Sequence, residues 1–227
     1  EALDALPWER LALLWINTPN NPTATTISLA AMEELARRCR AHGVVLASDE
    51  AYSDLWLAGP PPISALQLAD RTNVLVLNTL SKRSSMPGYH SGFLAGDPEL
   101  IATIKHYRPS VGVAPQTFVQ HASVAAWNDD EHVAQARQRY AAKCAVVAPA
   151  LVRAGLEAAG GRATFFLWQR VPGGDDVALA RTWLQAGLVV TPGSYFGTGG
   201  AGHVRVALVP TLEACERAAG VLARLSS

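Results

Sequence analysis

One lysine of this chain stands where covalent chemistry with an aldehyde is expected. The 227 residues include 19 lysines and arginines, of which only three are lysines: Lys82, Lys105 and Lys143. Arginine keeps its proton at any accessible pH, whereas a partly desolvated lysine amine can lose its proton and form a Schiff base. Lys82 closely follows the apolar run at 73–80, which is typical of a strand. It is therefore a candidate anchor for an aldehyde cofactor.

Three further residues match the other needs of such a cofactor. Besides the lysine, pyridoxal phosphate needs a carboxylate that keeps its ring nitrogen protonated and donors to its ring oxygen. Asp49 can supply the carboxylate, and Tyr52 and Asn21 can supply the donors. Taken singly, Asn21 would be a turn former and Asp49 a helix cap. Tyr52 would be a core aromatic residue and Lys82 a solvated surface lysine. Their joint occurrence favours the cofactor.

The elements around these residues are predicted to bring them to one edge of a sheet. The runs at 11–17, 44–50 and 73–80 are short, nearly continuous and rich in Val, Leu and Ile, as in a buried parallel sheet. Between the first two runs, Ser28 as N-cap and Gly43 as C-cap bound a helix with one apolar face. Ligands of open parallel sheets bind beyond the carboxyl ends of the strands. The candidate residues lie at or just after these strand ends in the sequence.

The whole chain is predicted to have an α/β fold in two domains. Residues 1–128 would form the larger, mostly parallel domain, in which Asp97 opens a helix through Tyr107. Residues 129–227 would form a smaller α+β domain, which is entered through Ala-rich helices. This smaller domain is predicted to contain a helix through Leu184 and a closing helix from about Thr211. It also has apolar runs at 164–171, 187–197 and 203–209.

Three motifs resemble the class I/II aminotransferases of the fold-type I pyridoxal-phosphate family. They are NTPNNPT at 17–23, SDEAYSDL at 48–55 and TLSKRSSMPG at 79–88, and they occur in the family's order and spacing. The resemblance covers nearly the whole chain. It implies a fold-type I large domain, here incomplete, and pyridoxal 5′-phosphate as cofactor. Family members carry further strands, a phosphate loop and a ring-stacking aromatic ahead of the first motif, so the N-terminal part of the family domain is expected to be absent.

The resemblance assigns roles to the candidate residues. It implies that Lys82 holds the cofactor covalently and that Asp49 pairs with the protonated ring nitrogen. Tyr52 and Asn21 match the donors to the 3′ oxygen of the cofactor, and Lys82, Asp49 and Tyr52 are the expected catalytic residues. Asn21 is also a candidate for substrate binding.

The phosphate of the cofactor is where the sequence departs from the family. Thr79 and Ser81 fall where the family places hydroxyls near the phosphate, and Thr79 is the better match. The family has an arginine eight residues after the lysine, and this chain has His90 there, which is either a cofactor-binding residue in its charged form or a lesion. An imidazole cannot form a bidentate fork, so phosphate affinity is expected to fall unless Arg83 or another group substitutes.

The substrate site is expected near the end of the chain. In HVRVALV, strand alternation places His203, Arg205 and Ala207 on one face. Arg205 matches the family's arginine for the substrate α-carboxylate, although an ordinary strand arginine would fit the local pattern equally well. VTPGSYFG at 190–197 resembles the family's loop over the substrate.

The predicted function is transamination between an amino acid and a 2-oxo acid. SKRSSMPGY and RPSVGVAPQ look most like the succinyldiaminopimelate aminotransferases of lysine biosynthesis, which would make N-succinyl-diaminopimelate the donor. Three alternatives stay open: a lyase or synthase of the same fold, a non-catalytic sensing domain of the kind attached to DNA-binding segments, and an inactive fragment.

Composition excludes several other classes of protein. With 19 acidic and 19 basic residues the net charge is zero, which argues against nucleic acid as a partner. No run reaches the roughly 18 apolar residues of a membrane span. Cys39, Cys144 and Cys215 fit neither a disulfide framework nor a metal motif, so no metal site and a cytoplasmic location are expected. The resemblance implies a homodimer for the complete protein.

Overall fold

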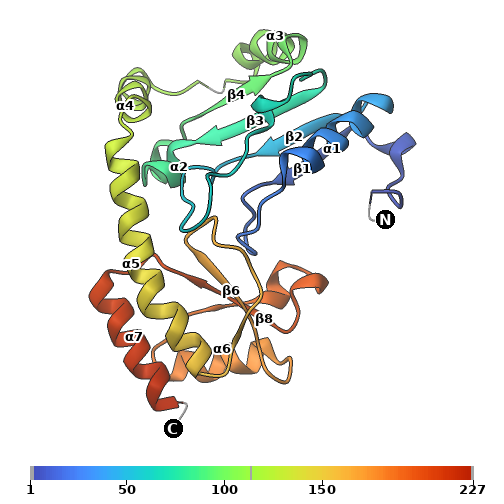
Figure 1. The fold of residues 1–227 in the computed structure, drawn as a ribbon. Helices are drawn as coiled ribbons and strands as arrows, with labels where there is room; N and C mark the ends of the chain where they lie inside the picture. The colour runs from blue at the N-terminus through green and yellow to red at the C-terminus, as the bar shows by residue number, and fades with distance from the viewer. Residues whose placement is uncertain (1–2, 113, 226–227) are drawn as a thin grey trace. The chain divides into compact units, whose positions relative to one another are not determined.

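The computed structural model describes residues 3–112 and 114–225, and its chain divides into two compact units (Figure 1). The segments of unit 1 are Glu1–Pro19, Thr26–Asp54 and Pro62–Asp130, and those of unit 2 are Asn20–Thr25, Leu55–Pro61 and Glu131–Ser227. Unit 2 therefore takes two short segments from the stretch that otherwise builds unit 1. The division into domains at 128/129 stays a prediction.

Unit 1 is built on a four-stranded sheet in the order β1-β2-β3-β4. Its strands are β1 (Leu13–Asn17), β2 (Val45–Asp49), β3 (Val74–Thr79) and β4 (Gly92–Gly96). The first three strands are parallel, and β4 runs antiparallel to β3. This partial, mostly parallel sheet confirms the predicted α/β fold class.

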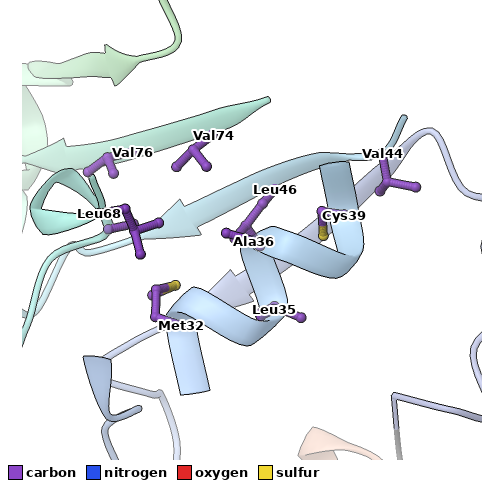
Figure 2. Packing of buried hydrophobic residues seen from close by; sticks show 10 residues of the cluster. Met32, Leu35, Ala36, Cys39, Val44, Leu46, Leu68, Val74 and Val76 are labelled. Atoms are coloured by element: carbon purple, nitrogen blue, oxygen red, sulfur yellow. The ribbon is translucent and has the colours of Figure 1, made fainter. Parts of the chain in front are cut away.

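Helix α1 (Leu29–Ala41) covers one face of this sheet. The Ser28 hydroxyl accepts a hydrogen bond from Ala31 N at 3.2 Å, and Gly43 follows the helix with φ 65°, so the predicted start and stop signals are both used. Figure 2 shows how the inner side of α1 meets the buried side chains of β2 and β3. Each large apolar side chain buried here contributes about 1.5–3 kcal/mol. The residues of the cluster on α1 are Met32, Leu35, Ala36 and Cys39.

Asp97 links β4 to the helix that follows, α3 (Pro98–Tyr107). Its Oδ1 accepts from Glu99 N at 2.8 Å as an N-cap, and its Oδ2 accepts from Asn73 N at 2.7 Å. The hydrogen bond from Asn73, followed by those from the helix start, holds the pKa of Asp97 below its usual value against the effect of burial. Because β4 is antiparallel to β3, α3 begins at the end of the sheet where β3 begins.

Three further helices lie along the same stretch of chain. In unit 1, α2 (Leu80–Arg83) connects β3 to β4 and α4 (Thr117–Trp127) follows α3, and α5 (Glu131–Arg153) begins the longest segment of unit 2. The predicted interruption near 128–130 separates α4 from α5. No helix among residues 3–112 and 114–225 is both long enough and apolar enough to cross a membrane.

Unit 2 has an antiparallel sheet in the order β5-β6-β8-β7 and two more helices. Its strands are β5 (Glu157–Ala158), β6 (Phe166–Arg170), β7 (Thr191–Pro192) and β8 (His203–Ala207), and the helices are α6 (Asp176–Gln185) and α7 (Leu212–Leu225). Helices α5 and α7 pack against each other (Figure 1). Of the apolar run at 187–197, only β7 pairs as a strand, and tight turns follow it.

The short segment that carries Asn21 is held by backbone contacts within unit 2. Gly161 N donates to Thr23 O at 2.9 Å, and Ala163 N donates to Ala24 O at 3.2 Å. A Cβ on Gly161 would overlap the Ala24 carbonyl, so only glycine allows this approach. The location of Asn21 therefore depends on residues that lie far along the chain.

Candidate active site

Asp49 lies at the carboxyl end of the central strand pair in unit 1. In the register of the parallel strands it is opposite Asn17 on one side and Leu77 on the other. Its carbonyl oxygen accepts from Asn17 Nδ2 and from Thr18 N, both at 3.0 Å. Its Oδ1 accepts from Ala51 N at 3.1 Å. The half-buried carboxylate is thus fixed at the strand end, as the sequence predicts, and Asn17 is a support that the motif reasoning did not single out.

Lys82 lies on α2, the single helical turn that directly follows β3. Thr79 caps this turn, because its Oγ1 accepts from Ser81 N at 3.1 Å. The same hydroxyl donates to Ser91 O at 2.9 Å and lies 2.9 Å from the Ser81 hydroxyl. Among the described residues, the half-buried Lys82 amine makes no hydrogen bond or ion pair. The Lys82 amine and the hydroxyls of Thr79 and Ser81 therefore lie on one turn of the chain.

A cavity of about 380 Å³ in unit 1 lies where β2 and β3 end, and it brings two of the predicted residues together. Asp49 and Thr79 both line it, and so does Ala51, the residue before Tyr52. A cavity of this size is in the range of small-molecule sites. Its other lining residues are Trp15, Leu77, Asn78, Gly92, Phe93, Leu94 and Arg108.

Two of the predicted cofactor residues lie elsewhere in unit 1. Tyr52 is buried in the turn after β2, with 7% of its surface exposed. His90 is exposed and has a left-handed backbone, with φ 48° and ψ 41°. It lines a separate cavity of about 660 Å³, which it shares with Tyr89, Arg108 and Gln116 among others.

Arg83 is committed to the interior of unit 1, which corrects its suggested role at the phosphate. Only 4% of the residue is exposed. Its Nη1 donates to Ala126 O at 2.7 Å and its Nη2 to Asp130 Oδ1 at 2.5 Å. Its guanidinium carbon lies 5.0 Å from the centre of the Trp127 ring. These contacts tie α2 to the end of α4 and leave Arg83 unable to act as a phosphate ligand.

Unit 2 brings Arg205 and Asn21 together. Arg205, on β8, donates from Nη1 to Asn21 Oδ1 at 2.7 Å and from Nη2 to Thr191 Oγ1 at 3.4 Å. Its guanidinium carbon lies 4.5 Å from the Phe166 ring centre and 4.8 Å from that of Phe196. The two rings sandwich the planar cation and fix its orientation.

Asp176 anchors the loop that carries Phe196, and the sequence reasoning missed it. Its Oδ2 accepts from Ser194 N at 2.7 Å, and its Oδ1 accepts from Gly202 N at 3.4 Å. Burial alone would raise the pKa of Asp176, which is 5% exposed, but the hydrogen bonds from Ser194 and Gly202 outweigh it and the pKa is lowered. A signal was present in the sequence: two aspartates, Asp175 and Asp176, stand at the start of α6. Asp175 alone is enough to cap the helix, so the second aspartate was available for another role.

The family described as aminotransferase class I and II matches residues 1–222. The chain belongs to this family. Its members depend on pyridoxal phosphate, so the resemblance, the fold class and the cofactor inferred from the motifs are confirmed.

Relatives in this family include enzymes of diaminopimelate metabolism. A probable aminotransferase of Mycobacterium tuberculosis is 39% identical over 98% of this chain and 54% of its own length. An LL-diaminopimelate aminotransferase of Nitratidesulfovibrio vulgaris is 34% identical over 98% and 60%. The structure of a probable N-succinyldiaminopimelate aminotransferase from Thermus thermophilus matches with a TM-score of 0.88 and 32% identity, over 98% of this chain and 62% of that one. The chain thus spans little more than half the length of these relatives.

The donor set of unit 1 suits the family's cofactor. A primary amine, a carboxylate fixed at a strand end and a pair of hydroxyls are the groups that an aldehyde, a pyridine nitrogen and a phosphate require. The part of the chain that the structure describes contains no cluster of three or more metal-ligating side chains.

Proposed function

We propose that the protein to which this chain belongs is an aminotransferase that moves an amino group from N-succinyl-diaminopimelate to a 2-oxo acid. The observation that carries the proposal is the common cavity of Asp49 and Thr79, with Lys82 on the turn that Thr79 caps. Bound pyridoxal phosphate would supply an electron sink for the charge that develops at the substrate carbon.

Lys82 and Asp49 would carry the proton chemistry. The Lys82 amine would hold the cofactor through its aldehyde group. Once free, its Nζ would be the base that takes a proton from the α-carbon of the substrate. Asp49 holds the proton on the ring nitrogen and stabilises the positive charge there. The hydrogen bond from Ala51 N to Asp49 Oδ1, with those from Asn17 Nδ2 and Thr18 N to the Asp49 carbonyl, would keep the carboxylate in place at no cost in reorganisation.

The remaining unit 1 residues would bind rather than react. Tyr52, with Asn21 of unit 2, would donate to the ring oxygen. The hydroxyls of Thr79 and Ser81 lie 2.9 Å apart and would donate to the phosphate, with Thr79 turning its proton away from Ser91 O.

Arg205 would bind the α-carboxylate of the substrate. A guanidinium pairs with a carboxylate through two parallel hydrogen bonds, and this pairing sets the orientation of the α-carbon. The sandwich of Phe166 and Phe196 holds the guanidinium plane before the substrate arrives. Because Asn21 accepts from Nη1, this residue also helps to orient the fork.

The choice of donor is supported by the relatives and by the two motifs SKRSSMPGY and RPSVGVAPQ. The relatives include an LL-diaminopimelate aminotransferase and a probable N-succinyldiaminopimelate aminotransferase. We further infer that the complete protein is a homodimer and acts in the cytoplasm, in lysine biosynthesis. Light scattering on the purified full-length protein would test the dimer.

Borohydride trapping tests the cofactor site. The chain is incubated with pyridoxal phosphate, reduced and digested, and the modified lysine is identified by mass spectrometry. We expect the adduct on Lys82, with Lys105 and Lys143 as internal comparisons. Absence of label on Lys82, or equal label on all three lysines, would contradict the proposal.

Product analysis tests the reaction in the full-length protein. With N-succinyl-diaminopimelate and 2-oxoglutarate, we expect one glutamate for each keto acid that forms from the donor. LL-diaminopimelate as the better donor would reassign the substrate. Release of free ammonia without amination of the acceptor would identify a lyase.

A further inference from the structure

A cofactor phosphate carries close to two negative charges, and its binding site needs a cation that forms more than one hydrogen bond. The residue at the family's arginine position in this chain is His90. Its side chain is exposed and faces the cavity of about 660 Å³, whose lining includes neither Asp49 nor Thr79. The residue next to Lys82, Arg83, is fully used within unit 1 by Ala126 and Asp130.

The cavity that contains Asp49 and Thr79 has one basic residue in its lining, Arg108. Arg108 also lines the cavity of His90, so it lies where the two cavities adjoin. Both cavities belong entirely to unit 1. Among the residues that line the Asp49 cavity, Arg108 alone carries a positive charge.

The topology of the sheet explains how Arg108 reaches this edge. Thr79, the last residue of β3, is opposite Gly92, the first residue of the antiparallel β4. The chain runs down β4, turns at the Asp97 cap and returns along α3. Arg108 follows the last residue of α3, and it lines the cavity at the edge where β3 ends and α2 begins.

We infer that Arg108 is the cation that binds the cofactor phosphate in this protein, in place of the arginine that the family has eight residues after its lysine. This inference rests on the proposed function. The guanidinium would meet the phosphate from the β4 side of the cavity, and the hydroxyls of Thr79 and Ser81 would meet it from the start of α2. His90 then needs no role in phosphate binding.

The test compares two aldehydes that differ only in the phosphate. Pyridoxal phosphate and pyridoxal are each titrated against the folded chain, reduced with borohydride, and the label on Lys82 is quantified by mass spectrometry. The variants are Arg108→Gln and His90→Ala. Lys105→Gln is the matched control, because it removes one positive charge from the preceding turn of α3, and Lys105 does not line the cavity of Asp49 and Thr79. Circular dichroism checks that each variant is folded.

For Arg108→Gln we expect the half-saturating concentration of pyridoxal phosphate to rise roughly 10- to 100-fold, as for loss of a charge-assisted hydrogen bond. The titration with pyridoxal should not change, and Lys105→Gln should resemble the parent chain with both aldehydes. An unchanged pyridoxal phosphate titration, or equal shifts for both aldehydes, would overturn the inference. So would a phosphate-specific shift in His90→Ala alone. If neither aldehyde labels Lys82 in the parent chain, the proposed function itself fails and the inference falls with it.

Discussion

The Nη1 atom of Arg205 donates to Asn21 Oδ1 at 2.7 Å across 184 residues of sequence. One of these residues lies in a turn near the start of the chain and the other on β8, yet both belong to unit 2. The two residues that the sequence assigned to the substrate therefore form one hydrogen-bonded pair. A substitution at either residue therefore removes a hydrogen bond from the other.

Replacement of Arg205 by lysine should weaken donor binding and leave the cofactor site intact. Lysine keeps the charge but loses the fork and the stack between Phe166 and Phe196. In the full-length enzyme we expect the donor concentration for half-maximal rate to rise roughly 10- to 100-fold. Steady-state kinetics measures this, and Arg153→Lys, on the exposed end of α5, is the matched control.

A second measurement distinguishes weaker binding of the substrate carboxylate from a disrupted fold in Arg205→Lys. The label that pyridoxal phosphate leaves on Lys82 should be the same in Arg205→Lys and in the parent protein. Unchanged donor dependence, or lost labelling of Lys82, would show that Arg205 has a different role.

Removal of the Asp176 carboxylate should loosen the loop that carries Phe196. Asp176→Ala leaves the N–H groups of Ser194 and Gly202 without their acceptor, and we expect a loss of about 2 kcal/mol in the free energy of unfolding. Urea denaturation measures the loss. Asp175→Ala, which removes only the N-cap of α6, should cost about 1 kcal/mol and leave the loop resistant to protease.

The same carboxylate predicts a dependence on pH. The pKa of Asp176 is lower in the folded chain than its ordinary value of 3.8, so the folded state binds fewer protons there than the unfolded state. Its contribution is complete above the ordinary value and is lost as the pH falls through the folded value. The stability difference between Asp176→Ala and the parent chain should therefore shrink in acid, and a constant difference would contradict this assignment.

Glu50 should destabilise the chain as the pH rises. It is 2% exposed and accepts from Ser48 Oγ at 3.1 Å and from Ala65 N at 2.8 Å. Burial raises the pKa of Glu50 despite these hydrogen bonds, so the folded chain favours the protonated form. Stability linked to this group is present below its ordinary pKa and lost as the pH rises through the raised value. Glu50→Gln should remove that loss, and thermal unfolding from pH 4 to pH 8 measures it.

Glu34 offers a control of opposite sign. Hydrogen bonds from Arg37 and Arg38 lower the pKa of this exposed carboxyl to about 2. Its contribution is present above about pH 4.5, the ordinary value, and is lost as the pH falls toward 2. In Glu34→Gln any change should appear at low pH only. If Glu50→Gln and Glu34→Gln altered the pH profile in the same direction, the burial argument for Glu50 would be wrong.

Gly161→Ala should displace the segment that holds Asn21. The added methyl group would overlap the Ala24 carbonyl oxygen, and we expect a loss of about 1–3 kcal/mol in stability. Gly199→Ala in the same unit is the control, since nothing lies within 4 Å of its Cβ position. Chemical denaturation compares the two, and equal stability would contradict the close approach.

The strands of unit 1 were predictable because their physical signal is local. A run such as 73–80 is nearly continuous in apolar residues, which is typical of a strand in a parallel sheet, although in the structure Val74 and Val76 are buried and Leu75 and Leu77 only half-buried. The direction of β4 carries no such signal. Its residues are partly exposed, and a strand reads alike in either direction, so its antiparallel pairing with β3 is visible only in the structure.

The candidate site divides in the same way. Lys82 and Asp49 stand in motifs whose residue types already imply the chemistry. Arg83 was misjudged because its partners Ala126 and Asp130 lie more than 40 residues along the chain. Asp176 was missed for a related reason, since the loop amides that it binds can belong to any residue type and leave no trace in the sequence.

The mixed origin of unit 2 bears on the order in which the protein is made. Residues 20–25 leave the ribosome before their backbone partners Gly161 and Ala163, which are translated roughly 140 residues later. At a translation rate of about 5–20 residues per second, these partners are synthesised on the order of 10–30 s after Asn21. Over that interval β2, β3 and β4 of the unit 1 sheet are synthesised, so the strands beside Asp49 are made before Arg205.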